Sequence, residues 1–351
     1  MNSKINININ GRIIGDNQPC YIIAEMSANH AGSYERAIEI IKAAKDSGAD
    51  CIKIQTYTPD TMTIDCNNEY FNIKKGAWNG ENLYKLYKKA YTPWEWQEGL
   101  KNKTKELGLD FLSTPFDKTS VDFLENLNVD FYKIASFELV DIPLIKYIAS
   151  KNKPIIMSTG MGTLGEIEDA VNAIKSMGNK DLCLLKCSSA YPAIPDDMNL
   201  MTMKNLKDTF GVNVGLSDHS LGSIAAVTAV AMGAKVIEKH FCLSRNIENP
   251  DASFSMEPQE FKNMVQDIRA AERAIGEVSY RISDRENESR IFRRSIFVVK
   301  DIKKGDKFTE ENIRIIRPGN GLKPKYYDDI LGKTAYCDIN KGTPLSWDKV
   351  I

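Results

Sequence analysis

The 351-residue sequence predicts an α/β protein: a parallel (β/α)8 TIM barrel followed by a small β-rich C-terminal domain. Eight short apolar runs alternate with amphipathic stretches before Gly276, which is the number and the size typical of such a barrel. Beyond Gly276, short β-rich pieces separated by Lys-Gly turns replace this alternation. An open doubly wound sheet is the alternative, but it does not usually need eight such regular units. No Gly-x-Gly-x-x-Gly motif follows the first run either.

The expected strands are short apolar runs, and the expected helices carry apolar residues at helical spacing. In the first helix, Ser33 can cap the amino terminus, and Ala37, Ile40, Ile41 and Ala44 fall on one face. Strands are expected at residues 20–24, 51–56, 111–113, 131–135, 154–158, 182–186, 212–217 and 236–239. Helices are expected at residues 34–47, 92–107, 119–127, 143–150, 164–177, 200–210, 221–232 and 258–275.

The longest interruption of this alternation is the insert at residues 57–91, after the second expected strand. It is polar and rich in aromatic residues, among them Trp78 and Tyr84. Because the loops after barrel strands lie on the catalytic face, we expect this insert to act as a lid or a subunit contact.

Composition indicates a soluble cytoplasmic protein. The 46 Lys and Arg residues balance 47 Asp and Glu residues, so no basic excess suggests nucleic acid or an anionic membrane as a partner. No apolar run reaches the length that spans a bilayer, and residues 1–10 are polar and alternating, unlike a signal peptide. The seven scattered cysteines fit thiols in a reducing compartment better than a disulfide framework.

The change of sequence pattern near Gly276 defines the expected domains. We expect the barrel at residues 1–280, a highly charged linker at residues 281–293 and the small domain at residues 294–351. With about sixty residues, the small domain is close to the lower limit for independent folding. We therefore expect the small domain to pack against the barrel of its own chain or of a partner.

Polar residues close the expected strands, and in such barrels the carboxyl ends of the strands carry the chemistry. Lys53, Lys133 and Lys186 lie on inward-facing strands, where an ammonium group is costly to bury without an anion or a carboxylate beside it. The lysines therefore favour a substrate that carries phosphate or carboxylate. Salt bridges with Glu25 or Glu238 are the structural alternative, and a Schiff-base lysine is the other catalytic one.

Two of the three histidines, His219 and His240, follow the last two expected strands. Each could simply bond a loop carbonyl, whereas the pair could hold one divalent metal. The sequence lacks the His-x-His of amidohydrolase barrels, and for Cys242, a conceivable third ligand, packing is the more ordinary role. Two histidines with open positions suit a substrate-polarising ion such as Mn²⁺ better than a closed structural zinc site.

Short motifs follow one another at the expected strand ends: Ala24-Glu25 with Asn29-His30, Lys53-Ile-Gln55-Thr, Ser113-Thr-Pro-Phe116, Lys133-Ile-Ala-Ser136, Ser158-Thr-Gly-Met161, Gly215-Leu-Ser-Asp-His219-Ser and Glu238-Lys-His-Phe241. In this order they closely resemble the sialic acid synthase family, and the resemblance covers essentially the whole chain. The C-terminal domain resembles that family's antifreeze-like (SAF) domain, with Arg293-Arg-Ser295 at its entrance. Residues 25–30 and 187–192 most resemble the pseudaminic acid synthases of the family. N-acetylneuraminate synthases usually carry Asn where this sequence has Ser189.

The resemblance implies a transferase that condenses phosphoenolpyruvate with an acetamido-hexose, releasing phosphate and forming a nine-carbon keto acid. The implied sugar is 2,4-diacetamido-2,4,6-trideoxy-altrose, and the alternative is an N-acetylneuraminate or legionaminate synthase. His219 and His240 would bind Mn²⁺ or Mg²⁺, with Mn²⁺ favoured, and the ion would hold the sugar's aldehyde oxygen. Phosphoenolpyruvate would be held by Lys53, Thr114, Lys133, Ser136, Ser158 and Ser217. The sugar would be surrounded by Gln55, Glu138, Ser189, Tyr191 and Asp251.

The resemblance also implies a homodimer in which the antifreeze-like domain of one copy reaches the active site of the other. Arg317 matches the arginine that contacts the sugar's amide group there, and Phe292 is its neighbour. Glu25 is the candidate for stabilising the cation formed in the reaction or for managing the proton of water. Two other classes remain open from the residues alone: a Schiff-base aldolase and a non-catalytic sugar- or ice-binding protein.

Overall fold

The computed structural model describes residues 6–76 and 78–351. Of the stretches discussed above, Met1–Ile5 and Ala77 of the insert lie outside the described residues. The chain divides into two compact units, Met1–Gly276 and Glu277–Ile351.

Within the described part of the first unit, eight strands form one parallel sheet in the order β5-β4-β3-β10-β9-β8-β7-β6. Strands β5 and β6, at the two ends of this order, lie in contact, so the sheet curves into a near-closed barrel. The prediction of a (β/α)8 barrel is confirmed. The strands are β3 (Tyr21–Glu25), β4 (Cys51–Thr56), β5 (Asp110–Pro115), β6 (Tyr132–Ile134), β7 (Ile155–Ser158), β8 (Leu182–Cys187), β9 (Asn213–Asp218) and β10 (Val236–His240).

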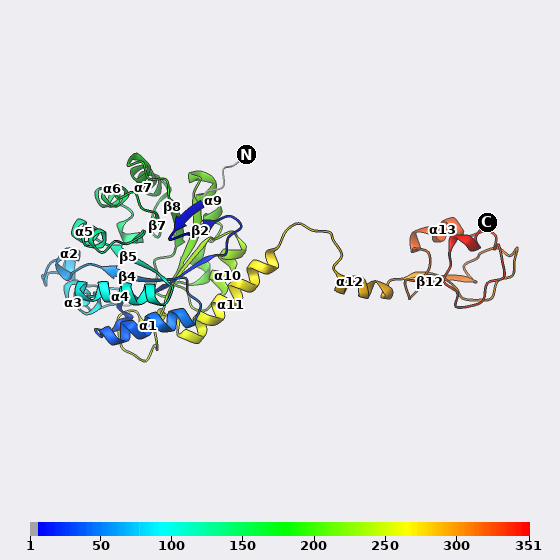
Figure 1. Cartoon of the computed structure of the whole chain (residues 1–351), viewed down its shortest axis with the longest axis horizontal. Coiled ribbons are helices and arrows are strands. Elements are labelled where there is room, and N and C mark those ends of the chain that lie inside the picture. The colour runs from blue at the N-terminus through cyan, green and yellow to red at the C-terminus, as the bar shows by residue number, and fades with distance from the viewer. Residues whose placement is uncertain (1–5, 77) are drawn as a thin grey trace. The chain divides into compact units, whose positions relative to one another are not determined.

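Helices surround the sheet (Figure 1), because each presents an apolar stripe to the outer face of the strands. Helix α1 shows the cause: Ser33 Oγ accepts a hydrogen bond from Arg36 N at 3.2 Å, and Ala37, Ile40 and Ile41 are buried. The helices that follow the eight strands are α1 (Tyr34–Asp46), α4 (Trp94–Glu106), α5 (Lys118–Asn126), α6 (Ile142–Ala149), α7 (Leu164–Ser176), α9 (Thr202–Phe210), α10 (Ile224–Ala231) and α11 (Pro258–Ile275). Short additional elements are η1 (Ser27–His30), α2 (Pro59–Met62), η2 (Glu69–Phe71), α3 (Leu83–Ala90), η3 (Ser136–Glu138), α8 (Pro195–Met198) and η4 (Ala252–Phe254).

A hairpin of β1 (Asn6–Ile9) and β2 (Arg12–Gly15), for which the sequence analysis expected no strands, precedes the barrel. Its apolar residues recur with period two, and Ile7, Ile9 and Ile14 are buried. They pack with inward-facing residues near the amino-terminal ends of the barrel strands, including Tyr21 and Phe131. The hairpin therefore closes the end of the barrel opposite the carboxyl ends of the strands.

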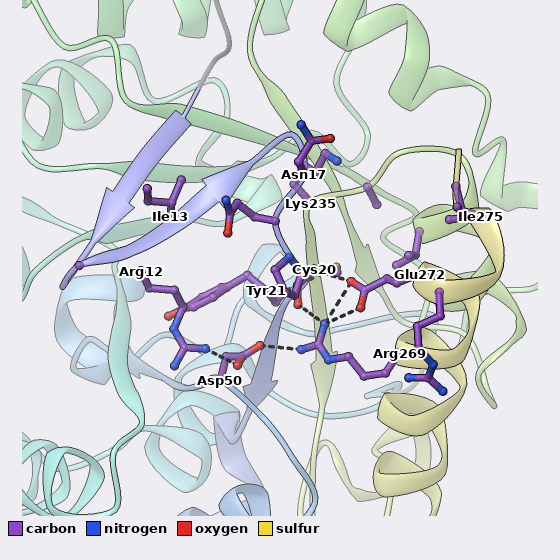
Figure 2. A pocket seen from close by; sticks show the side chains of 17 residues that line it. Arg12, Ile13, Asn17, Cys20, Tyr21, Asp50, Lys235, Arg269, Glu272 and Ile275 are labelled. Atoms are coloured by element: carbon purple, nitrogen blue, oxygen red, sulfur yellow. Dashed lines mark hydrogen bonds and ion pairs between the residues drawn. The ribbon is translucent and has the colours of Figure 1, made fainter. Parts of the chain in front are cut away.

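A pocket of about 910 Å³ lies at this amino-terminal end, between the hairpin and the last turns of α11 (Figure 2). Several of its charges pair with one another: Arg269 contacts Asp50 at 3.2 Å and Glu272 at 3.1 Å, and Arg12 also bonds Asp50. The Arg269 guanidinium further donates to Cys20 O at 2.8 Å. This network ties the start of β3 to α11, and we assign it a structural role.

The second unit has its own hydrophobic core, in which Ile296, Phe308, Ile313 and Ile330 are buried. Its strands β11 (Ser295–Val298) and β12 (Ile313–Ile316) pair antiparallel. The region expected as a linker contains a short helix capped by Ser283. The remaining elements are α12 (Asp284–Ser289), η5 (Arg290–Phe292), η6 (Pro324–Tyr326), α13 (Tyr327–Ile330) and η7 (Trp347–Lys349).

Two expectations from composition can be compared directly with the structure. All seven cysteines lie in the described part of the chain, and each is a free thiol. In that same part, we find no helix with both the length and the apolar character needed to cross a membrane.

Candidate active site

Four buried charged residues, one each from β3, β4, β6 and β10, form a cluster inside the barrel. Lys53 Nζ on β4 lies 2.6 Å from Glu25 Oε2 on β3 and 3.6 Å from Glu238 Oε1 on β10. Lys133 Nζ on β6 lies 3.7 Å from the same Glu238 oxygen. The barrel is required for this arrangement, because residues far apart in sequence come together only when the strands are ordered around one axis.

Protonation in this cluster is uneven. Burial raises the pKa of Glu25 to about 7, although Lys53 opposes the shift. Burial would also raise the pKa of Glu238, but Lys133 and Lys53 together hold it below its usual value. Burial lowers the pKa of Lys133, whereas for Lys53 the two carboxylates outweigh burial and raise it. At neutral pH, Glu238 is therefore ionised while Glu25 is partly protonated.

Hydroxyl groups surround the cluster. Lys133 Nζ donates to Ser158 Oγ at 2.7 Å, and Ser217 Oγ donates to Glu238 Oε1 at 3.0 Å. The Oγ1 atom of Thr114, on β5, is buried and has no hydrogen-bond partner among the described residues. Ser136 Oγ accepts from the N–H of Gly160 at 3.0 Å. Ser158 thus contacts Lys133 directly, and Ser217 contacts the carboxylate that lies near both lysines.

Gly160 is required by this packing. A Cβ atom at this position would collide with the hydroxyl oxygens of Ser136 and Ser189. The glycine therefore lets the β7 loop approach both serines closely.

His219 and His240 lie next to each other at the ends of β9 and β10, with ring centroids 5.5 Å apart. His219 Nδ1 is 3.0 Å from Ser188 O, an acceptor, so Nδ1 carries a proton. Burial alone would lower the pKa of this ring, but Cys187 and the Ser188 carbonyl outweigh burial and raise it. The Nδ1 atom of His240 is buried and without a hydrogen-bond partner in the described structure. Burial lowers the pKa of His240 well below its usual value, so this ring is neutral. The neutral His240 ring, and Nε2 of His219 once that atom is deprotonated, fit a divalent ion.

Within the residues that the structure describes, no group of three or more His, Cys, Asp and Glu side chains is arranged to hold a metal. Cys242 is buried, and burial raises the pKa of its thiol to about 12, which disfavours a thiolate ligand. A metal held by the histidine pair would therefore keep coordination positions open.

Aromatic rings wall the histidine pair. The ring of Tyr191 stacks on His219 with centroids 4.2 Å apart, and Phe254 lies 5.0 Å from both Tyr191 and His240. Trp78, from the insert after β4, lies 5.5 Å from Tyr191, and its indole N–H donates to Pro250 O at 2.9 Å. The insert thus contributes one aromatic ring beside Tyr191.

The remaining sugar-site candidates lie on β4 and on the segments that follow the strands. Gln55 Nε2 donates to Ser27 Oγ at 3.0 Å, and the buried Asp251 accepts from Ala28 N at 3.1 Å. Burial raises the pKa of Glu138 to about 7, and its Oε2 atom has no hydrogen-bond partner in the described structure. Ser189 Oγ lies 3.8 Å from Cys187 Sγ, at the end of β8.

One predicted residue lies apart from the charged cluster, two belong to the second unit, and some functional candidates were missed. Lys186 is half-buried and donates to Cys187 O at 3.0 Å, apart from the charged cluster. Phe292 and Arg317 belong to the second unit and are exposed. The sequence analysis considered Glu238 only as a possible salt-bridge partner. Its position two residues before His240 on the same strand could have placed it on the same face. No sequence pattern identified Phe254 as a residue near the histidines.

Comparison with known proteins adds an independent line of evidence. The model of the NeuB family matches residues 40–280, and that of the SAF domain matches residues 293–351. The pseudaminic acid synthase of Campylobacter jejuni (serotype O:23/36, strain 81-176) is 48% identical over 93% of this chain and 95% of that protein. The pseudaminic acid synthase of Helicobacter pylori is 46% identical over 95% of this chain and 98% of that protein. Among solved structures, N-acetylneuraminic acid synthetase from Leptospira borgpetersenii in complex with citrate matches with a TM-score of 0.73 and 30% identity, over 82% of this chain and 95% of that one.

Proposed function

Because the chain belongs to the NeuB family, as its motifs indicated, we propose that it is a pseudaminic acid synthase. It condenses phosphoenolpyruvate with 2,4-diacetamido-2,4,6-trideoxy-altrose and releases phosphate. The observation that carries this proposal is the buried pair Lys53 and Lys133 beside the open pair His219 and His240, at one end of the barrel. The identity of 48% to a pseudaminic acid synthase supports the choice of sugar. An N-acetylneuraminate or legionaminate synthase is the second candidate, supported by the match to the Leptospira synthetase.

The choice of sugar is tested directly by phosphate release. Purified protein with Mn²⁺ and phosphoenolpyruvate is expected to release phosphate rapidly with the diacetamido-trideoxy-altrose, and slowly or not at all with N-acetylmannosamine or the diacetamido-trideoxy-mannose. If N-acetylmannosamine were the only one of these sugars to be turned over, the assignment as a pseudaminic acid synthase would be wrong. Borohydride trapping with pyruvate provides a control, since a Schiff-base aldolase would be labelled and this enzyme would not.

Phosphoenolpyruvate fits the lysine side of the site. Its phosphate and carboxylate groups would meet the ammonium groups of Lys53 and Lys133, which hold fixed positive charge away from water. Ser136, Ser158, Ser217 and Thr114 would complete the contacts as neutral donors, and the unpartnered Thr114 hydroxyl supports such a role. Glu238, ionised between the two lysines, would keep both ammonium groups oriented.

The sugar fits the histidine side of the site. A divalent ion on His219 and His240, Mn²⁺ rather than Mg²⁺ in our proposal, would polarise the aldehyde oxygen of the open-chain sugar. The Ser188 carbonyl fixes the orientation of the His219 ring, and Tyr191 stacks against it. Gln55, Glu138, Ser189 and Asp251 are the polar groups available to the hydroxyl and acetamido groups. Trp78 and Phe254 cover the site and exclude water.

The reaction makes one carbon–carbon bond and breaks one carbon–oxygen bond. The methylene carbon of phosphoenolpyruvate bonds the aldehyde carbon, whose oxygen takes a proton. Water then adds to the phosphate-bearing carbon, and the tetrahedral intermediate expels phosphate and leaves a ketone. Glu25 lies beside Lys53 with a pKa of about 7, which suits it to accept the proton of that water.

The rate is expected to fall on the acid side because of Glu25. Since only the carboxylate can accept a proton, kcat should decrease as pH falls through about 7, approaching tenfold per pH unit. In Glu25→Gln this limb should disappear and the maximal rate should fall by about 10²-fold. A pH–rate profile of single turnovers measures both effects. The exposed Glu39 on α1 provides the matched control, and Glu39→Gln should keep the wild-type profile. A wild-type rate that is flat across neutral pH would contradict this role.

We further propose that the enzyme is a domain-swapped homodimer, in which Arg317 and Phe292 of one copy serve the sugar site of the other. Mixing the His219→Ala variant with the Arg317→Ala variant tests this arrangement. If the SAF domain acts in trans, each mixed dimer has one intact site, and random reassortment should restore about a quarter of the wild-type rate. If it acts in cis, the mixture should show no more than the mean of the two separate variants. The assay is phosphate release after subunit exchange, with each variant alone as control.

A further inference from the structure

The second unit contains a pocket whose lining is strongly basic. Its cavity volume is about 660 Å³, which lies in the range of small-molecule sites. The lining combines η5 and the start of β11 with the loop and short helix that follow β12. No Asp or Glu belongs to that lining. Five cationic side chains do: Arg290, Arg293, Arg294, Lys323 and Lys325.

These five cations lack the counter-ions that neighbouring cations have. On the same unit, Lys300 pairs with Glu311 at 3.1 Å and Lys303 with Asp338 at 2.9 Å. In the described part of the chain, by contrast, no cation of the pocket lies within salt-bridge distance of a carboxylate. Arg290 reaches only the neutral Asn287 Oδ1 at 3.3 Å. A concave surface with charge of one sign focuses its field and attracts the opposite charge.

The floor of the pocket is built by a buried serine. Ser295 Oγ donates to Pro318 O at 2.6 Å and accepts from Gly321 N at 2.8 Å. Gly319 N donates to Ile291 O at 2.8 Å, which ties the loop to η5. A Cβ at Gly321 would collide with Ile296 O, so only glycine permits this close approach. The loop is therefore held in place while the cations above it stay exposed.

We propose that this pocket is a binding site for a small multivalent oxyanion, bearing phosphate or carboxylate groups. Guanidinium groups bind such oxygens in bidentate fashion, and the lysines add point charges. Which anion fills it depends on the proposed function: phosphoenolpyruvate, released phosphate and the sugar acid share this chemistry. Arg317, the arginine assigned to the sugar, directly precedes the loop that forms the floor of this pocket.

The test uses the full-length chain in a Lys133→Met background, which weakens anion binding at the barrel. Selective ¹⁵N-glycine labelling provides reporters, because Gly319 and Gly321 line the pocket. Inorganic phosphate, phosphoenolpyruvate and N-acetylneuraminate are titrated separately. We expect saturable shifts of the Gly319 and Gly321 signals, with affinity about tenfold weaker in Lys323→Gln/Lys325→Gln. The matched control, Lys300→Gln/Lys303→Gln, removes the same charge from outside the pocket and should leave the affinity unchanged.

The outcomes distinguish the possible anions from one another and a true binding site from non-specific binding. Tighter binding of phosphoenolpyruvate identifies the substrate as the ligand, and equal binding of all three supports a general oxyanion site. Non-saturable shifts, or equal weakening in the control variant, would overturn the proposal. A pocket variant that changes only the sedimentation coefficient would overturn it as well, since the face would then be a protein interface. The titration requires no turnover, so it stands even if no sugar releases phosphate.

Discussion

Lys133→Met is expected to lower kcat/KM for phosphoenolpyruvate by about 10²–10³-fold. Methionine keeps much of the lysine's length but removes the ammonium group that contacts Ser158 and lies near Glu238. Glu238 retains Lys53 and Ser217 as partners, so the chain should still fold. Steady-state kinetics with phosphoenolpyruvate as the varied substrate measure the loss, and thermal unfolding checks the fold.

A second buried lysine provides the matched control for this change. Lys101 on α4 donates to the carbonyl oxygens of Leu127 and Asn128, away from the strand ends. Lys101→Met should therefore lower the free energy of unfolding and leave kcat/KM unchanged for the folded enzyme. Equal kinetic losses in the two variants would mean that Lys133 acts through stability alone.

Combining His219→Ala with His240→Ala is expected to abolish tight Mn²⁺ binding and to lower kcat by about 10³-fold, equivalent to about 4 kcal/mol. The physical reason is that each imidazole can supply a nitrogen lone pair once deprotonated, whereas alanine supplies none. Calorimetric titration with Mn²⁺ measures the first effect and phosphate release the second.

The third histidine serves as the control for the metal site. His30 is buried, and its ring packs against Trp96 and lies 3.3 Å from Thr92 Oγ1. His30→Ala should lower stability but keep one Mn²⁺ bound per folded chain. A wild-type enzyme that keeps its full rate after treatment with EDTA would refute the metal role of His219 and His240.

Local patterns in the sequence were sufficient for the architecture of the first unit. The apolar runs and amphipathic stretches predicted the eight barrel strands and the helices between them. Buried positions recur about every 3.6 residues in a helix, and a fully buried strand is a continuous apolar run, so both are visible in the order of apolar residues. The hairpin β1–β2 carried a period-two signal in Ile7 and Ile9, but the strands are only four residues long. Such short runs are hard to distinguish from a polar leading segment.

The sequence alone was enough to predict which side chains the strands bring to the site. The positions of Lys53, Lys133, His219 and His240 relative to the apolar runs identified them. Only the tertiary structure decided how they are paired. Glu238 on β10 reaches Lys53 on β4 and Lys133 on β6 because the sheet curves into a barrel, and no local pattern records that approach. Trp78 and Phe254 reach the histidines from loops, whose paths depend on packing rather than on periodicity. The physical reason is that burial in a helix or strand recurs periodically along the sequence and can be read from it. A charged cluster depends instead on distances between residues that are far apart in the sequence.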